Sequence, residues 1–141
     1  MIRDDMRRVT PIILTAAALL VVLDVVGELA GKPLGFPYRA LGVVSLVVYV
    51  GVGATSAWRT NFATGVLAAA LVGFLDGTLG PLAAWLVGAG PVSQETTDAR
   101  VFAYSIAVVT AIAASGGILG SAAGSWLERR RGIRGSRVVH R

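Results

Sequence analysis

Apolar residues along this chain are gathered into four long runs, which short polar or basic segments separate. The runs cover residues 11–30, 37–58, 62–87 and 99–127. Each has about 18 residues or more, enough for a helix to cross a hydrocarbon core of about 30 Å. The pattern therefore predicts an all-α integral membrane protein with four transmembrane helices in a single membrane domain.

The first run opens with residues that are typical of a helix N-terminus. Thr10 can accept a hydrogen bond from the first turn, and Pro11 suits the first helical position because its missing N–H has no partner there. We therefore expect the first helix to begin at Pro11, after a flank of residues 1–9. A cleaved signal peptide is disfavoured, because cleavage after Ala30 would place Glu28 where a small neutral residue is needed.

The connections and the basic residues predict the topology. Residues 31–36 and 59–61 are short connections, so successive helices should be antiparallel neighbours. Most of the 13 basic residues belong to one side of the membrane, namely the N-terminal flank, Arg59 and the tail of residues 128–141. The other side has Lys32, Arg39 and Arg100. Because basic flanks stay in the cytoplasm, we expect both termini to be cytoplasmic in an inner or plasma membrane.

The composition agrees with this pattern and excludes several kinds of site. Of the 141 residues, 55% are apolar, and the mean hydropathy is +0.71, which is too apolar for a soluble domain of this size. The chain has no cysteine, and its one histidine, His140, lies in the polar tail. We therefore expect no metal site and no cofactor. The net charge of +5 lies in the flanks, so nucleic acid is not an expected partner.

Two nine-residue segments are alike. AAALLVVLD at 16–24 and AAALVGFLD at 68–76 are identical at six of nine positions. The similarity suggests a tandem repeat of a two-helix unit, with its halves related by a pseudo-two-fold axis along the membrane normal. Chance is the alternative, because alanine and leucine are common in this chain. In a true repeat, Asp24 and Asp76 would lie at equal depth and could face each other across the axis.

Asp24 and Asp76 are the centre of a candidate intramembrane polar site. A carboxyl at this depth is costly, and such groups usually face protein or water. Two interpretations remain open: a proton relay or cation site, or a structural role in which each acid hydrogen-bonds a neighbouring helix. Glu28, one turn after Asp24 and near Lys32, is expected to form an ion pair at the interface.

Pro81 predicts a kink or a break in the third helix. A proline cannot donate to the carbonyl of Gly77, and its ring crowds that carbonyl. A break would expose the Gly77 carbonyl beside Asp76 and Thr78, as in the discontinuous transporter helices that bind ions. A kink would let the helix continue, with Trp85 in the aromatic belt.

Small residues recur every four positions in the third and fourth runs. Such rows let helix backbones approach closely. They indicate packing inside the four-helix unit or, alternatively, the seam of a homo-oligomer. The candidate packing residues are Gly65, Gly73, Gly116, Gly120 and Gly124.

The tail of residues 128–141 contains a basic cluster, whose candidate lipid-facing residues are Arg129, Arg130, Arg131 and Arg134. We expect it to orient the protein and to contact anionic lipid head groups, at about 1 kcal/mol per basic residue. Docking to a cytoplasmic protein is the alternative.

Two functional hypotheses follow. The sequence shows no nucleophile with its base, no phosphate loop and no metal cluster, so we do not expect an enzyme. The working hypothesis is a non-catalytic structural or accessory subunit, which packs into a larger membrane complex through its small-residue faces. The alternative is an ion- or proton-coupled transporter or channel that uses Asp76 and Asp24.

Overall fold

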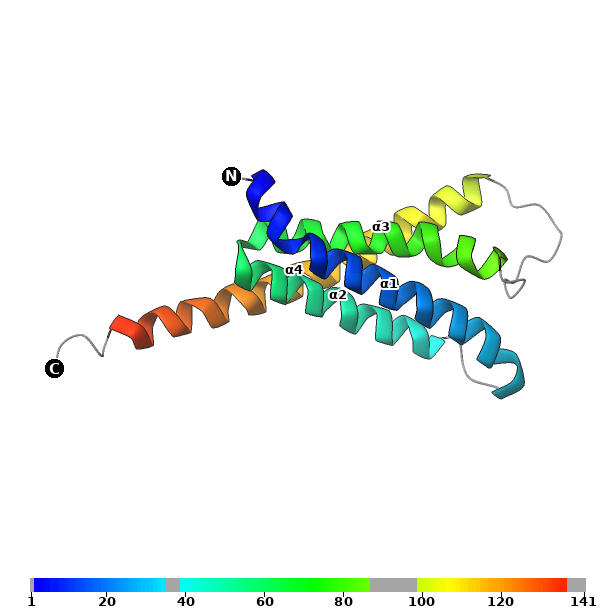
Figure 1. The fold of residues 1–141 in the computed structure, drawn as a ribbon, viewed down its shortest axis with the longest axis horizontal. Helices are drawn as coiled ribbons and strands as arrows, with labels where there is room; N and C mark the ends of the chain where they lie inside the picture. The colour runs from blue at the N-terminus through cyan, green and yellow to red at the C-terminus, as the bar shows by residue number, and fades with distance from the viewer. Residues whose placement is uncertain (1, 35–38, 87–98, 137–141) are drawn as a thin grey trace.

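The computed structural model describes residues 2–34, 39–86 and 99–136, and they form four α-helices (Figure 1). The helices are α1 (Ile2–Leu34), α2 (Arg39–Arg59), α3 (Phe62–Leu86) and α4 (Ala99–Ser136). Each contains a segment that is long and apolar enough to cross a membrane. The predicted all-helical class and the number of long apolar helices are confirmed.

The start of α1 differs from the expectation. The helix begins at Ile2, so Thr10 and Pro11 lie inside it. Asp4 and Asp5 occupy the first turn, where negative charge is favourable against the partial positive charge of a helix N-terminus. The Thr10 hydroxyl donates to the Met6 carbonyl at 2.8 Å instead of capping the helix. Asp4 and Asp5 thus favour a helix start at Ile2, and the predicted start at Pro11 is wrong.

The end of α4 also differs. The fourth helix was expected to end at Leu127, but α4 continues through the basic cluster to Ser136. Glutamate and arginine are good helix formers, and basic residues are favourable near a helix C-terminus. The Arg130 guanidinium lies 3.7 Å from the centre of the Trp126 ring, a cation–π contact one turn along the helix. Figure 1 shows this end of α4 extending beyond the other helices.

α3 begins at a defined cap and is continuous through its proline. The Asn61 side-chain oxygen accepts a hydrogen bond from the Thr64 backbone N–H at 2.9 Å, as a helix N-cap does. The Asn61 amide also donates to Asp5 at 2.9 Å, which links the turn between α2 and α3 to the start of α1. The helix is not broken at Pro81, so the interpretation of α3 as a discontinuous helix is wrong.

Backbone contacts join α4 to α2 and α3. A Cβ atom on Gly120 would lie 2.9 Å from the Ala54 backbone nitrogen of α2, and one on Gly73 of α3 would lie 3.2 Å from the Val109 carbonyl oxygen of α4. No ordinary side chain fits into such gaps, so glycine is required where the backbones approach this closely. α4 therefore packs along both neighbours at once.

The contacts follow a regular register. On one side of α4, residues 65, 69, 73 and 77 of α3 lie against residues 121, 117, 113 and 109. On the other side, residues 46, 50 and 54 of α2 lie against residues 116, 120 and 124. A four-residue step on each helix keeps the same faces in contact over several turns.

α1 occupies a different position from α3. It packs against α3 and α2, and over the described ranges its backbone does not closely approach that of α4, whereas the backbones of α2 and α3 do approach each other. A two-fold axis that relates α1 to α3 and α2 to α4 would make the α1–α4 pair equivalent to the α2–α3 pair. The predicted two-fold packing is therefore not observed. The sequence explains the difference, because Ile13, Val21 and Val25 stand in α1 where the repeat has Gly65, Gly73 and Gly77 in α3. With these larger side chains α1 has no glycine face for α4.

The interior and the surface are both apolar. The buried core contains Val9, Leu20 and Val72, together with small alanines. On the outside, Leu14 and Leu119 are at least 60% exposed, and every helix exposes further leucines or valines. A surface of this kind is far more apolar than that of a soluble monomer.

We predict that Gly120→Ala destabilises the protein, whereas Gly51→Ala does not. A methyl group at 120 would overlap the Val50 carbonyl, while a Cβ at 51 would meet no atom within 4 Å. Overpacking costs about 1–3 kcal/mol, and an open glycine in a helix gains up to about 1 kcal/mol on replacement by alanine. Denaturant titration in detergent micelles measures both changes. Equal effects of the two substitutions would contradict the backbone contact.

Candidate functional site

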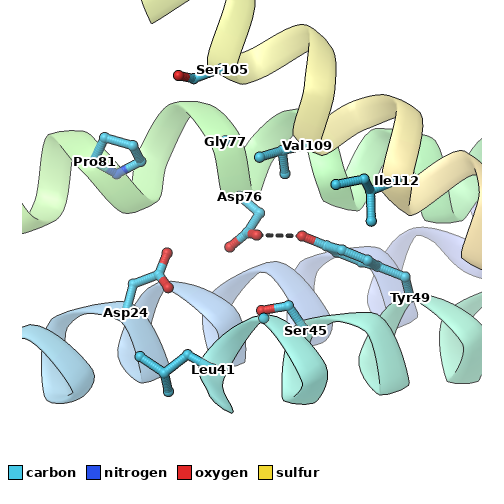
Figure 2. A pocket seen from close by; sticks show the side chains of 11 residues that line it. Asp24, Leu41, Ser45, Tyr49, Asp76, Gly77, Pro81, Ser105, Val109 and Ile112 are labelled. Atoms are coloured by element: carbon cyan, nitrogen blue, oxygen red, sulfur yellow. Dashed lines mark hydrogen bonds between the residues drawn. The ribbon is translucent and has the colours of Figure 1, made fainter. Parts of the chain in front are cut away.

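A cavity of about 240 Å³ lies between the four helices. It is found toward the end of the bundle where α1 ends and α2 begins, opposite the turn between α2 and α3 (Figures 1 and 2). Its polar lining residues are Asp24, Ser45, Tyr49, Asp76 and Ser105. Its other lining residues are Leu41, Gly42, Gly77, Pro81, Val109 and Ile112. The cavity therefore brings both candidate aspartates to one site.

Asp76 forms the buried inner part of this site. Its side chain is 7% exposed, and the Tyr49 hydroxyl of α2 donates a hydrogen bond to its Oδ2 atom (Figure 2). Its other oxygen, Oδ1, is buried and has no hydrogen-bond partner within the described part of the chain. An acceptor of this kind is costly to bury unless something else binds it. Asp76 therefore has one oxygen held by Tyr49 and one buried oxygen without a partner in the described structure, which a proton or a cationic donor would satisfy.

Asp24 reaches the same cavity from α1. Figure 2 shows its carboxyl pointing into the space between α1 and α3. A Cβ atom on Gly80 would lie 3.3 Å from Asp24 Cγ and would overlap Oδ2. The absence of a side chain at Gly80 therefore leaves room for this carboxyl.

The two acids are not level with each other along the helices. Asp24 lies beside Gly80 of α3, and Asp5 bonds Asn61 just before α3, so residues of α1 meet residues 56 positions later in the chain. The repeated segments are 52 positions apart. Asp24 is thus displaced by about one helical turn from Asp76, and the expected equal depth is not observed.

Three polar lining residues were not predicted from the sequence: Tyr49, Ser45 and Ser105. Tyr49 is 2% exposed and lies in the middle of an apolar run. A buried tyrosine hydroxyl usually has a hydrogen-bond partner. A polar partner for Tyr49 in a neighbouring helix could therefore have been predicted from the sequence. The two serines are indistinguishable in sequence from the serines that pack elsewhere, and only the tertiary structure places them at the cavity.

Of the other candidate residues on α3, two line the cavity and one does not. Gly77 and Pro81 are both lining residues, and Pro81 still cannot donate to the Gly77 carbonyl. The Thr78 hydroxyl donates to the Phe74 carbonyl at 2.7 Å, along its own helix. Thr78 is not among the lining residues.

The candidate packing glycines all lie inside the four-helix unit. Gly65 and Gly73 are buried against α4, and Gly116, Gly120 and Gly124 are buried against α2. Each glycine face is therefore covered by another helix of the same chain. The alternative of an oligomer seam on these faces gains no support.

Some candidate residues at the ends of the helices have no described side chain. Arg129 and Arg130 are exposed on α4. The side chains of Glu28, Lys32, Trp85, Arg131 and Arg134 lie outside the described residues, as does His140. The expected ion pair and lipid contacts of these groups therefore stay predictions.

The chemistry of the cavity is that of a site for positive charge. Two carboxyls and three hydroxyls line it, and none of its lining residues is basic. Over the described ranges, no three His, Cys, Asp or Glu side chains form a group that could hold a metal ion. The arrangement can accept protons and N–H donors, and its mixture of acids and apolar walls is typical of a binding cavity.

The fold and the site define a four-helix protein with four candidate membrane-spanning helices around a shared two-carboxyl cavity. Neither a known protein family, nor a curated protein, nor a solved structure matches the chain. Its function therefore has to be argued from the cavity itself.

We predict that Tyr49→Phe lowers the free energy of unfolding by about 1–3 kcal/mol, because it leaves a buried carboxyl oxygen without its donor. Tyr104→Phe is the matched control, since Tyr104 is 72% exposed on α4. Unfolding in mixed micelles, followed by circular dichroism, compares the two. A loss of the same size in both variants would show that the hydrogen bond to Asp76 contributes nothing.

Proposed function

We propose that the protein is a small multi-pass transporter in which Asp76 and Asp24 bind a cation or proton and couple its movement to a conformational change. The observation that carries this proposal is the convergence of the two acids, from α3 and α1, on one cavity. Acids that served structure alone would be expected to lie apart, each against its own neighbour.

The proposal places the four helices across a cell membrane. The exposed leucines and valines support this placement, because lipid would cover them. Rising residue numbers in α3 meet falling numbers in α4, whereas α2 and α4 rise together. This register supports an up-and-down order of antiparallel neighbours. With both termini in the cytoplasm, the cavity lies in the outer half of the protein.

The inner half of the bundle supports a transporter rather than a channel. Between the cavity and the turn after α2 lie buried apolar residues, among them Val9, Ile13 and Val72. The hydrogen bond from Asn61 to Asp5 links the turn between α2 and α3 to the start of α1 at the same end. A site whose inner end is packed shut meets one requirement of alternating access.

The competing hypothesis of an accessory subunit loses its main argument. It relied on small-residue faces that a partner protein would cover. Those faces are covered by helices of this chain, as the burial of Gly73 and Gly120 illustrates. The hydrogen bond from Tyr49 to Asp76 fits a structural role as well, but it does not account for the convergence of both acids on one cavity. Transport is therefore the function that we propose for the site.

Cation-driven proton flux in liposomes tests the proposal. The purified chain is reconstituted around a pH-sensitive dye, and gradients of Na⁺, K⁺ and an alkylammonium salt are imposed in turn. We predict that Asp76→Asn lowers the coupled flux at least about tenfold, because it removes the group that binds the coupling ion. Asp24→Asn should lower it as well, and so should Gly80→Ala, which displaces the Asp24 carboxyl.

Glu128→Gln is the control for this assay, because Glu128 is an exposed acid of α4 outside the cavity. It should leave the flux unchanged. If every gradient gives the same flux with wild type, with Asp76→Asn and with empty liposomes, the protein is not a transporter of this kind.

Cysteine labelling tests the topology. The chain has no cysteine, so Glu95→Cys and Arg134→Cys each introduce a single thiol. We predict that a membrane-impermeant maleimide labels residue 95 in sealed right-side-out vesicles. It should label residue 134 only after the vesicles are permeabilised, because basic flanks stay cytoplasmic. Labelling of both residues from the same side would overturn the proposed orientation.

A further inference from the structure

We propose that the cavity binds a compact organic monocation, such as an alkylammonium ion, in exchange for a proton on Asp76. This inference rests on the proposed transport function and names its substrate class. Three features carry it: the size of the cavity, the scarcity of oxygen ligands for an inorganic ion, and the available oxygen of Asp76.

The size of the cavity suits a small molecule rather than a bare ion. Its volume of about 240 Å³ exceeds the roughly 150 Å³ of an apolar cavity that accepts benzene. A dehydrated metal ion would fill a small part of this space. A cation with several carbon atoms would fill most of it.

The ligand set is poor for an inorganic ion. Calcium takes six to eight oxygen ligands and magnesium demands an octahedral set, whereas this cavity offers two carboxyls and three hydroxyls from four helices. These groups supply seven oxygens, but the Tyr49 hydroxyl and Asp76 Oδ2 already bond each other. At most five oxygens therefore remain, fewer than either ion takes. A hydrated ion would also bind weakly, because the waters around it would face the side chains of Leu41, Val109 and Ile112, which form no hydrogen bonds.

An organic cation meets both parts of this lining. Its alkyl groups would contact Leu41, Pro81, Val109 and Ile112, and burial of apolar surface favours binding by about 25 cal/mol per Å². Its N–H would donate to a carboxylate oxygen, a charge-assisted bond of the stronger kind. The apolar walls that exclude a hydrated metal ion are therefore the walls that would hold this ligand.

Asp76 Oδ1 supplies the exchange with a proton. Oδ2 accepts from Tyr49, while Oδ1 is buried without a partner in the described structure. Oδ1 can carry a proton or accept the N–H of the cation, but not both. When the cation binds, the proton leaves Oδ1 for cavity water, so the charge of the site is unchanged.

The other titratable groups at the cavity are few. Asp24 faces it from α1 and Tyr49 from α2. The lining residues of α4, which are Ser105, Val109 and Ile112, do not titrate in the physiological range. Proton release on binding is therefore expected to depend on the two aspartates, with Asp76 as the site of exchange.

Titration calorimetry on the full chain in detergent micelles tests the inference, with triethylammonium and Na⁺ as probes at equal ionic strength. We predict that triethylammonium binds at least about tenfold more tightly than Na⁺, a difference of about 1.4 kcal/mol. Binding should strengthen from pH 6 to pH 8 and should release a proton, measured from the heats in two buffers. Asp76→Asn should abolish both binding and proton release.

Gly42→Leu and Gly51→Leu form a matched pair for the size of the cavity. Both glycines lie on α2, and a Cβ on either would meet no atom within 4 Å. Gly42 lines the cavity, and Gly51 does not. We predict that Gly42→Leu weakens triethylammonium binding about tenfold while Gly51→Leu leaves it unchanged, because only the first reduces the space for the ligand.

The outcomes separate this inference from the transport function. Na⁺ binding as tight as triethylammonium binding, an absence of proton release, or equal effects of the two leucine variants would each overturn the inference. If Na⁺ gradients alone then drive Asp76-dependent flux in liposomes, the transport function stands with a different substrate. If no gradient drives flux, both proposals fail together.

Discussion

The close approach of α4 to α2 and α3 is the constraint on which the rest of the structure depends. In lipid, where we propose that the helices lie, they gain little from hydrophobic burial, so backbone contact and van der Waals packing hold them together. Glycines such as Gly53 and Gly120 make that contact. α1 has no comparable face and packs on α3 and α2 instead, with no close backbone approach to α4 in the described structure. The bundle is therefore tight around α4 and looser where α1 joins it.

This unequal packing determines where the polar groups meet. Because α1 is displaced by about one turn along α3, Asp24 lies beside Gly80 and not beside Asp76. Gly80 leaves room for the carboxyl, and the Tyr49 hydroxyl holds one oxygen of Asp76. The two acids thus have different surroundings, one shaped by a glycine and the other by a tyrosine, although similar nine-residue segments contain them. Such a difference suits two groups with separate roles in binding.

The sequence predicted some boundaries well and others poorly. The start of α3 at Phe62 matches the prediction, because Asn61 is a strong cap and the connection before it is short. α1 and α4 extend beyond their apolar runs, to Ile2 and Ser136. Hydropathy reports where lipid could lie, not where a helix ends, and charged residues with high helix propensity continue a helix into water. Pro81 likewise lies within a continuous α3.

By itself, the sequence determined that four long apolar helices form and that Asp24 and Asp76 are placed within them, because hydropathy and chain length act locally. It also placed glycine at every fourth position, where close packing can occur. Tertiary structure alone decided which helices those glycines join, that Tyr49 reaches Asp76, and that both acids line one cavity. The physical reason is that helix register and partner choice depend on side-chain volumes summed over whole faces. No local pattern in the chain reports that sum.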